Sequence, residues 1–262
     1  DIHELRRRHI AEMLDSIADN HGAVMADRTL AALRKGLAWW SARDDSFSSP
    51  IIRGMARTRP ADLARDRVLS DEEIRGLGRA IDAPGEPGEP TFPAAYGRLV
   101  KCLLLSACRL RELSNAEWAD LKEGALAITP KRDKTGAGRS VRLPAAVMAL
   151  LGARGPGFVF STDGGARPFS GFSKAKGQLD ARIAELREAD GLAPMPDWRL
   201  HDLRRSARSL LSRCGVPVDH AERALGHRIG GVRATYDRHS YDAEVGEALA
   251  ALGSLVERIL DP

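Results

Sequence analysis

Residues 201–241 read HDLRRSARSLLSRCGVPVDHAERALGHRIGGVRATYDRHSY, and this stretch decides how the rest of the chain is interpreted. It holds a His-x-x-Arg pair at His201 and Arg204, a Leu-Gly-His turn that ends at His227, and Tyr236 nine residues further on. The three-residue spacing puts His201 and Arg204 on one face of a helix. An imidazole beside a guanidinium places a proton-handling group next to an anion clamp. The stretch therefore predicts an anion site with a phenol close by in the chain.

Two of the three tyrosines follow this histidine- and arginine-rich helix. Tyr96 has the surroundings of a core residue, whereas Tyr236 and Tyr241 are both candidates for a nucleophile. A free phenol has a pKa of about 10, so it needs nearby cations to react as a phenolate at neutral pH. Between residues 199 and 213 five arginines face a single acid, Asp202: Arg199, Arg204, Arg205, Arg208 and Arg213. We expect this helix to lie near phosphate.

Two basic residues far upstream are further candidates for the same site. Arg109 follows an apolar helix in SACRLREL, and Glu112 lies three residues on, where it shares a helix face with the arginine. A planar guanidinium can hold two phosphate oxygens at once. Arg111 competes for this role by position, and Lys134 lies in the polar turn KRDKTGAGR, from which a lysine can reach into a groove. Taken alone, each of these side chains also suits an ordinary surface charge.

His227 follows a glycine, which lets the backbone turn tightly so that the histidine begins a new element. A structural histidine is the alternative. A metal ligand is less favoured, because no cysteine or acid lies at ligand spacing, and we expect no metal and no cofactor. The three cysteines, Cys102, Cys108 and Cys214, are typical of reduced core residues in a cytosolic protein.

The composition is that of a globular protein with room for basic surfaces. The 262 residues carry a net charge of +4 and a pI near 9.1, which permits nucleic-acid binding without requiring it. No apolar run is long enough to span a membrane and no signal peptide is visible, so we expect a cytoplasmic protein with no membrane partner.

The pattern of apolar residues predicts a mainly helical chain with a small antiparallel β-sheet and two domains. Residues 1–58 form a small helical module, 59–68 a linker for which a solvated surface helix is the alternative, and 69–262 the larger domain. Ser70 and Glu73 are spaced as a capping box, and a short helix is expected across 113–121. Strands near Leu126–Thr129 and Ser140–Leu143 form a hairpin. A last apolar helix packs either on a neighbouring protomer or back on its own domain.

Together these residues resemble the tyrosine recombinase family, the phage-integrase type. The set of six occurs in the family's order along the chain: Arg109, Lys134, His201, Arg204, His227 and Tyr236. Glu112 matches the acid after the first arginine, and this register selects Tyr236 over Tyr241. Ser-Ala-Cys precedes Arg109 where the family usually has Thr-Gly and a bulky aliphatic residue, a small departure.

The resemblance implies a fold, a reaction and partners. Residues 1–58 would be the core-binding domain, and 69–262 the mixed α/β catalytic domain with its C-terminal helix. Tyr236 would attack a DNA phosphorus to give a 3′-phosphotyrosyl intermediate without ATP or metal. Arg109 and Arg204 would neutralise the phosphate, His227 would hydrogen-bond it, Lys134 would protonate the leaving oxygen and His201 would accept or orient the tyrosine proton. Glu112 would support Arg109.

The expected partners are a double-stranded core site, further protomers in a tetramer on two DNA sites, and accessory DNA-bending or directionality factors. The resemblance implies a DNA-integrating enzyme that is encoded by a bacterium, a phage or another mobile element and is associated with the nucleoid. A type IB topoisomerase-like enzyme and a DNA-binding protein with an inactive site are the alternatives. The chain begins with Asp1, and the arm-binding domain common in phage integrases is not among the expected domains, which fits a fragment of a longer protein.

Overall fold

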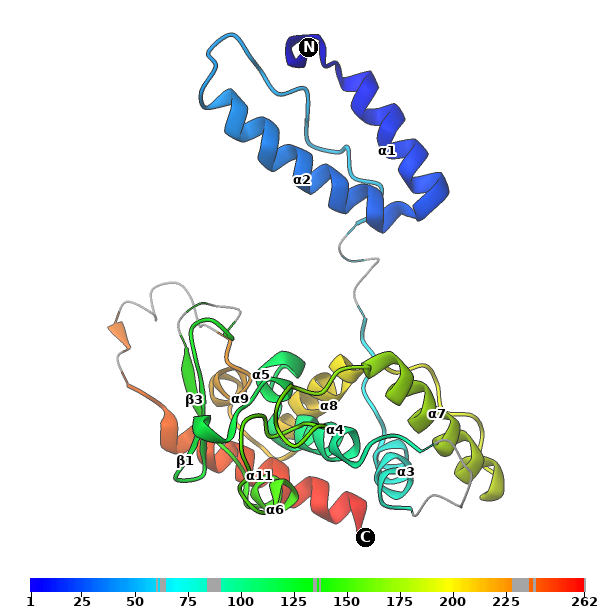
Figure 1. The fold of residues 1–262 in the computed structure, drawn as a ribbon, viewed down its shortest axis with the longest axis vertical. Helices are drawn as coiled ribbons and strands as arrows, with labels where there is room; N and C mark the ends of the chain where they lie inside the picture. The colour runs from blue at the N-terminus through cyan, green and yellow to red at the C-terminus, as the bar shows by residue number, and fades with distance from the viewer. Residues whose placement is uncertain are drawn as a thin grey trace. The chain divides into compact units, whose positions relative to one another are not determined.

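The computed structural model describes residues 1–59, 61, 65–83, 91–133, 136, 138–227, 236–237 and 239–261. The chain divides into two compact units, Asp1–Asp66 and Arg67–Pro262 (Figure 1). Most of the described elements are helices, and a small antiparallel sheet lies in the second unit, as the sequence predicts. The division of roles between residues 1–58 and 69–262 stays a prediction.

The first unit is a pair of helices and the segment that follows them, residues 42–58, which packs back against the helices and is called the strap below. A 3₁₀ turn, Ile2–Glu4, precedes α1 (Arg7–His21), and Gly22, whose φ is 86°, turns the chain into α2 (Ala23–Ser41). Apolar side chains from both helices and from the strap share one core: Ile10, Leu14, Ala26, Leu30, Leu37, Phe47 and Met55. The Asp27 carboxylate accepts hydrogen bonds from the backbone nitrogens of Arg57 (2.6 Å) and Thr58 (2.9 Å), which ties the strap to α2.

The second unit is built around α4 (Ala94–Ser106), which has ten buried residues and packs against α8 and α6 (Figure 1). The other helices are α3 (Asp71–Asp82), α5 (Leu110–Ser114), α6 (Ala145–Leu151), α7 (Phe172–Ala189), α8 (Leu200–Arg213), α9 (Val218–Ala224) and α11 (Asp242–Leu260). The predicted capping box of Ser70 and Glu73 is confirmed at the start of α3. Tyr96 is fully buried in this core, and the cysteines are free, with Cys102 and Cys108 buried and Cys214 partly so.

The sheet contains strands β1 (Leu121–Lys122), β2 (Ala125–Ile128) and β3 (Arg139–Arg142), in the order β1-β2-β3. Leu126 pairs with Val141, which confirms the predicted hairpin to within one residue. The helix expected across 113–121 is confirmed only in part, because α5 ends at Ser114 and a separate 3₁₀ turn covers Trp118–Asp120, so a continuous helix is wrong. There the backbone turns away to bond the segment around residue 158, since Trp118 N donates to Gly157 O and Val159 N to Ala116 O.

The C-terminal helix α11 folds back on its own unit. It packs against α9, α3, α8, β3, α4 and α6, and it buries Leu249, Leu252, Leu255, Val256 and Ile259. Of the two packings open from the sequence, the structure has the intramolecular one. Among the described residues, no helix is both long and apolar enough to span a lipid bilayer.

Candidate active site

The turn between α4 and α5 places Arg109. α4 ends at Ala107, which adopts the left-handed conformation with φ 53°, and Arg109 then occupies the N-cap position of α5. Glu112, one turn into α5, accepts a bond from the Arg109 backbone nitrogen at 2.8 Å and another from Nη1 at 2.7 Å. The spacing seen in the sequence thus makes a local clasp that fixes the direction of the guanidinium.

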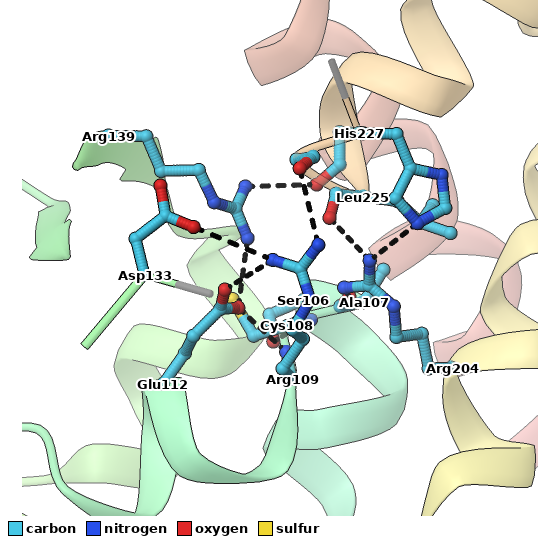
Figure 2. A network of polar contacts seen from close by, with 12 residues as sticks. Ser106, Ala107, Cys108, Arg109, Glu112, Asp133, Arg139, Arg204, Leu225 and His227 are labelled. Atoms are coloured by element: carbon cyan, nitrogen blue, oxygen red, sulfur yellow. Dashed lines mark hydrogen bonds and ion pairs between the residues drawn. The ribbon is translucent and has the colours of Figure 1, made fainter. Parts of the chain in front are cut away.

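Glu112 also holds a second arginine that sequence reasoning missed. Its side chain is 1% exposed, and Oε2 lies 3.0 Å from Nη2 of Arg139 on β3 (Figure 2). Arg139 also donates to the carbonyl of Ala224, at 3.3 Å, and Asp133 Oδ1 lies 4.0 Å from Arg109 Nη1. Only a tertiary contact joins Arg139 to Glu112, so no local signal in the sequence identifies it.

Arg204 approaches the same place from α8 and is only 4% exposed. Its guanidinium donates to the carbonyls of Ala107 and Leu225, which joins the α4–α5 turn to the end of α9. Burial and the nearby Arg109 lower the pKa of Arg204 to about 10, so the group is still a cation at neutral pH. Two arginines 95 positions apart in the chain therefore bring positive charge to one site.

His227 follows Gly226, whose φ is 70°, in a turn that touches both arginines (Figure 2). Arg109 Nη2 donates to the Gly226 carbonyl at 3.3 Å, and Arg204 Nη2 lies 3.2 Å from His227 Nε2. On the other side of the ring, Nδ1 lies 2.5 Å from Oε2 of Glu222. An alanine Cβ at residue 226 would come within 2.5 Å of the Arg139 guanidinium, so the Arg139 side chain would have to shift, and the positive φ also favours glycine.

A hollow of about 750 Å³ joins four of the predicted residues. Its lining includes Arg109, His201, Arg204, Arg205, Arg208 and His227. Partial burial and the charges of Arg205 and Arg204 lower the pKa of His201, so its ring is neutral at pH 7 and able to accept a proton. Arg205 pairs with Asp202 and Arg208 with Glu222, and both border the hollow.

Two of the remaining sequence candidates, Tyr236 and Arg111, do not line the hollow. Tyr236 is 80% exposed and is not among the residues that line the hollow. Lys134 lies outside the described residues. The Arg111 guanidinium lies 5.2 Å above the Phe172 ring and does not line the hollow either, so the structure offers no support for it as an alternative to Arg109.

Tyr241, the alternative nucleophile, is engaged with its neighbours. Its hydroxyl donates to Asp237 Oδ2 at 2.7 Å, and the guanidinium carbon of Arg223 lies 3.8 Å from the ring centre. The hydrogen bond to Asp237 raises the pKa of Tyr241, which disfavours the phenolate. Arg223 also pairs with Asp237, at 3.2 Å. Tyr241 is thus suited to holding this segment rather than to attack.

Comparison with known proteins gives one family and a set of similar folds. Residues 68–242 match the model of the phage integrase family. A lambda integrase dimer bound to a COC′ core site is 18% identical, with a TM-score of 0.59, over 87% of this chain and 81% of that one. A lambda integrase tetramer bound to a Holliday junction is 19% identical, with a TM-score of 0.57, over 87% and 65% of the two chains. The Tn1549 transposon integrase, in complex with circular intermediate DNA, is 14% identical, with a TM-score of 0.60, over 94% and 86%. A comparison with curated proteins found no significant match.

Proposed function

The chain belongs to the phage integrase family of tyrosine recombinases, and from this premise we propose that it is a site-specific DNA recombinase. In this proposal it cleaves and rejoins DNA through a 3′-phosphotyrosyl bond. One observation carries it: Arg109, Arg204, His201 and His227, which come from three separate parts of the chain, line a single hollow. Cations gathered around an open space are the expected recognition site for a phosphodiester.

The two arginines are prepared for an anion before it arrives. Each guanidinium is anchored by carbonyl or carboxylate partners, so little reorganisation is needed when a phosphate binds. Burial and the nearby Arg109 lower the pKa of Arg204, and a bound phosphate would relieve the repulsion between the two cations. We infer that Arg109 and Arg204 hold the two non-bridging oxygens and that Glu112 fixes Arg109.

The covalent step then follows from the groups around the hollow. The Tyr236 oxygen bonds to phosphorus, the bond to the 5′ oxygen breaks, and the phenol proton passes to neutral His201. Lys134 donates a proton to the leaving 5′ oxygen, and His227 hydrogen-bonds the phosphate. Tyr236 is 80% exposed and does not line the hollow, so this step requires its phenol to approach the hollow. The phosphotyrosyl bond retains the energy for religation, so the proposal includes neither ATP nor metal.

The proposed partners follow from the relatives. The similar structures contain DNA as a core site, a Holliday junction or a circular intermediate, and one of them is a tetramer. We propose that this chain binds a duplex core site and assembles as a tetramer on two sites, with residues 1–58 gripping the core DNA. Accessory bending or directionality factors belong to the same proposal, as does an origin in a phage or mobile element.

A nicked suicide duplex that carries the cognate core site tests the proposal. The wild-type protein should give a covalent adduct that resists SDS, Tyr236→Phe should give none, and Tyr241→Phe should still react. EDTA should leave the yield unchanged, and binding should weaken steeply with salt, because phosphates contribute much of the affinity. An adduct from Tyr236→Phe but not from Tyr241→Phe would overturn the choice of nucleophile. Cleavage that depends on added metal would point to a nuclease instead.

A further inference from the structure

Glu222 on α9 lies behind His227 and has no part in the six-residue motif. Its Oε2 lies 2.5 Å from His227 Nδ1, and its Oε1 accepts a bond from Nε of Arg208 at 2.8 Å. Its carbonyl also accepts the His227 backbone N–H at 2.9 Å. Both the side chain and the main chain of Glu222 therefore hold the histidine.

The surroundings of the ring select one tautomer of His227. On the Nε2 side the neighbour is Arg204 Nη2, at 3.2 Å, and a guanidinium has donors but no acceptor. Nε2 must therefore present its lone pair to Arg204, and Nδ1 carries the proton that is donated to Glu222. Hydrogen bonds from His227 and Arg208 lower the pKa of Glu222, so the carboxylate is ionised at neutral pH.

We propose that Glu222 is a positioning residue that fixes the direction and tautomer of His227 and keeps Nε2 turned toward the phosphate hollow. The inference rests on the proposed function. A carboxylate behind a histidine orients the ring and offsets positive charge on it, as in other histidine sites. For Nε2 to donate to a phosphate oxygen, the ring must carry a second proton, and the Glu222 carboxylate at Nδ1 is the charge that would balance it.

The second contact of Glu222, with Arg208, links it to another helix of the site. Arg208 belongs to α8, the helix that also carries His201 and Arg204, and its Nη1 donates to Ser212 Oγ at 2.6 Å. Through Arg208, Glu222 couples the His227 turn to the helix that supplies two other site residues. Both contacts depend on the negative charge of the carboxylate.

The kinetic test compares Glu222→Gln, which keeps the shape but removes the charge, with the wild type on the nicked suicide duplex. At saturating DNA we expect adduct formation to slow by about 10- to 100-fold, the usual effect of removing a carboxylate that orients a histidine, with an unchanged dissociation constant for DNA. Glu247→Gln, an exposed glutamate on α11, is the matched control and should react at the wild-type rate. A variant that cleaves at the wild-type rate would overturn the proposal.

A double-mutant cycle separates positioning from other effects. In a His227→Ala background, Glu222→Gln should cause no further loss of cleavage, because the residue it positions is gone. An undiminished loss in that background would mean that Glu222 acts elsewhere, through Arg208, and the proposal would fail.

Side-chain ¹⁵N NMR of the DNA-free protein tests the contact without any reaction. The His227 signals, assigned by comparison with His227→Ala, should show a protonated Nδ1 and a bare Nε2, and Glu222→Ala should lose this preference while the rest of the spectrum keeps its dispersion. A protonated Nε2 and bare Nδ1 in the wild type would refute the proposal even if cleavage is normal. Conversely, if the wild type forms no adduct but shows the expected tautomer, the proposed function fails and the Glu222 contact stands.

Discussion

Replacing Glu112 with glutamine removes a buried negative charge that two arginines share. The carboxylate contacts Arg109 Nη1 at 2.7 Å and Arg139 Nη2 at 3.0 Å, and it is 1% exposed. Breaking a buried ion pair from one side costs about 3–5 kcal/mol, because the remaining charge loses its partner. The arginine side chains are 21% and 16% exposed and keep some access to water, so we expect a loss near the lower limit, about 3 kcal/mol. In a unit of this size, that corresponds to a fall in Tm of about 6–12 °C.

Thermal and urea unfolding followed by circular dichroism would measure this loss. Glu185→Gln is the matched control, since Arg182 and Glu185 form another pair three residues apart on a helix, at 3.2 Å, but with Glu185 56% exposed. Such an exposed pair contributes about 0–1 kcal/mol. If the two variants lose the same free energy of unfolding, burial does not strengthen the contribution of the Glu112 charge to stability, and the reasoning is refuted.

Three other perturbations test separate parts of the structure. Gly226→Ala should lower the free energy of unfolding in urea by at least about 1 kcal/mol, because alanine is strained at this positive φ. Its cleavage rate should also fall, because the added Cβ displaces the Arg139 side chain. Wild-type stability and a wild-type rate would contradict this. Since the pKa of His201 is lowered, its proton-accepting form persists below the ordinary value, so the cleavage rate should stay level from pH 8 to about 6.5 and decline only at lower pH. A cleavage rate that already declines between pH 8 and about 6.5 would exclude His201 as the base. Asp27→Ala should make the Thr58 amide exchange faster with deuterium, since the carboxylate accepts that N–H at 2.9 Å; unchanged protection would rule out the strap contact.

The features that the sequence predicted well are those that depend on near neighbours. The capping box at Ser70 and Glu73 needs only four residues, and the hairpin needs two short apolar segments and a polar turn between them. The clasp of Arg109 by Glu112 is equally local. The chain beyond Ser114 forms only a 3₁₀ turn, Trp118–Asp120, and no continuous helix, because backbone groups there bond a segment about forty residues later, which no local pattern shows.

Arg139 and Glu222, two further residues around the site, were missed for a related reason. Arg139 is one of 40 basic residues, and only the folded chain brings it to Glu112, 27 positions away. Glu222 lies five residues before His227 in a helix rich in charge, where a glutamate is typical of a solvated face. The motif identifies groups expected to touch the phosphate, but the residues that hold those groups are fixed by tertiary packing.

The position of α11 limits how the proposed tetramer can form. Five of its large apolar side chains are buried within its own unit, and burying such a side chain contributes about 1.5–3 kcal/mol. Their sum is comparable with the whole stability of an ordinary domain, about 5–15 kcal/mol. A protomer that released α11 to a neighbour would therefore need to receive the same helix from another protomer. Every protomer can do so only if the exchange of helices forms a closed ring. Without such an exchange, the contacts between protomers must be made by surfaces other than the buried face of α11.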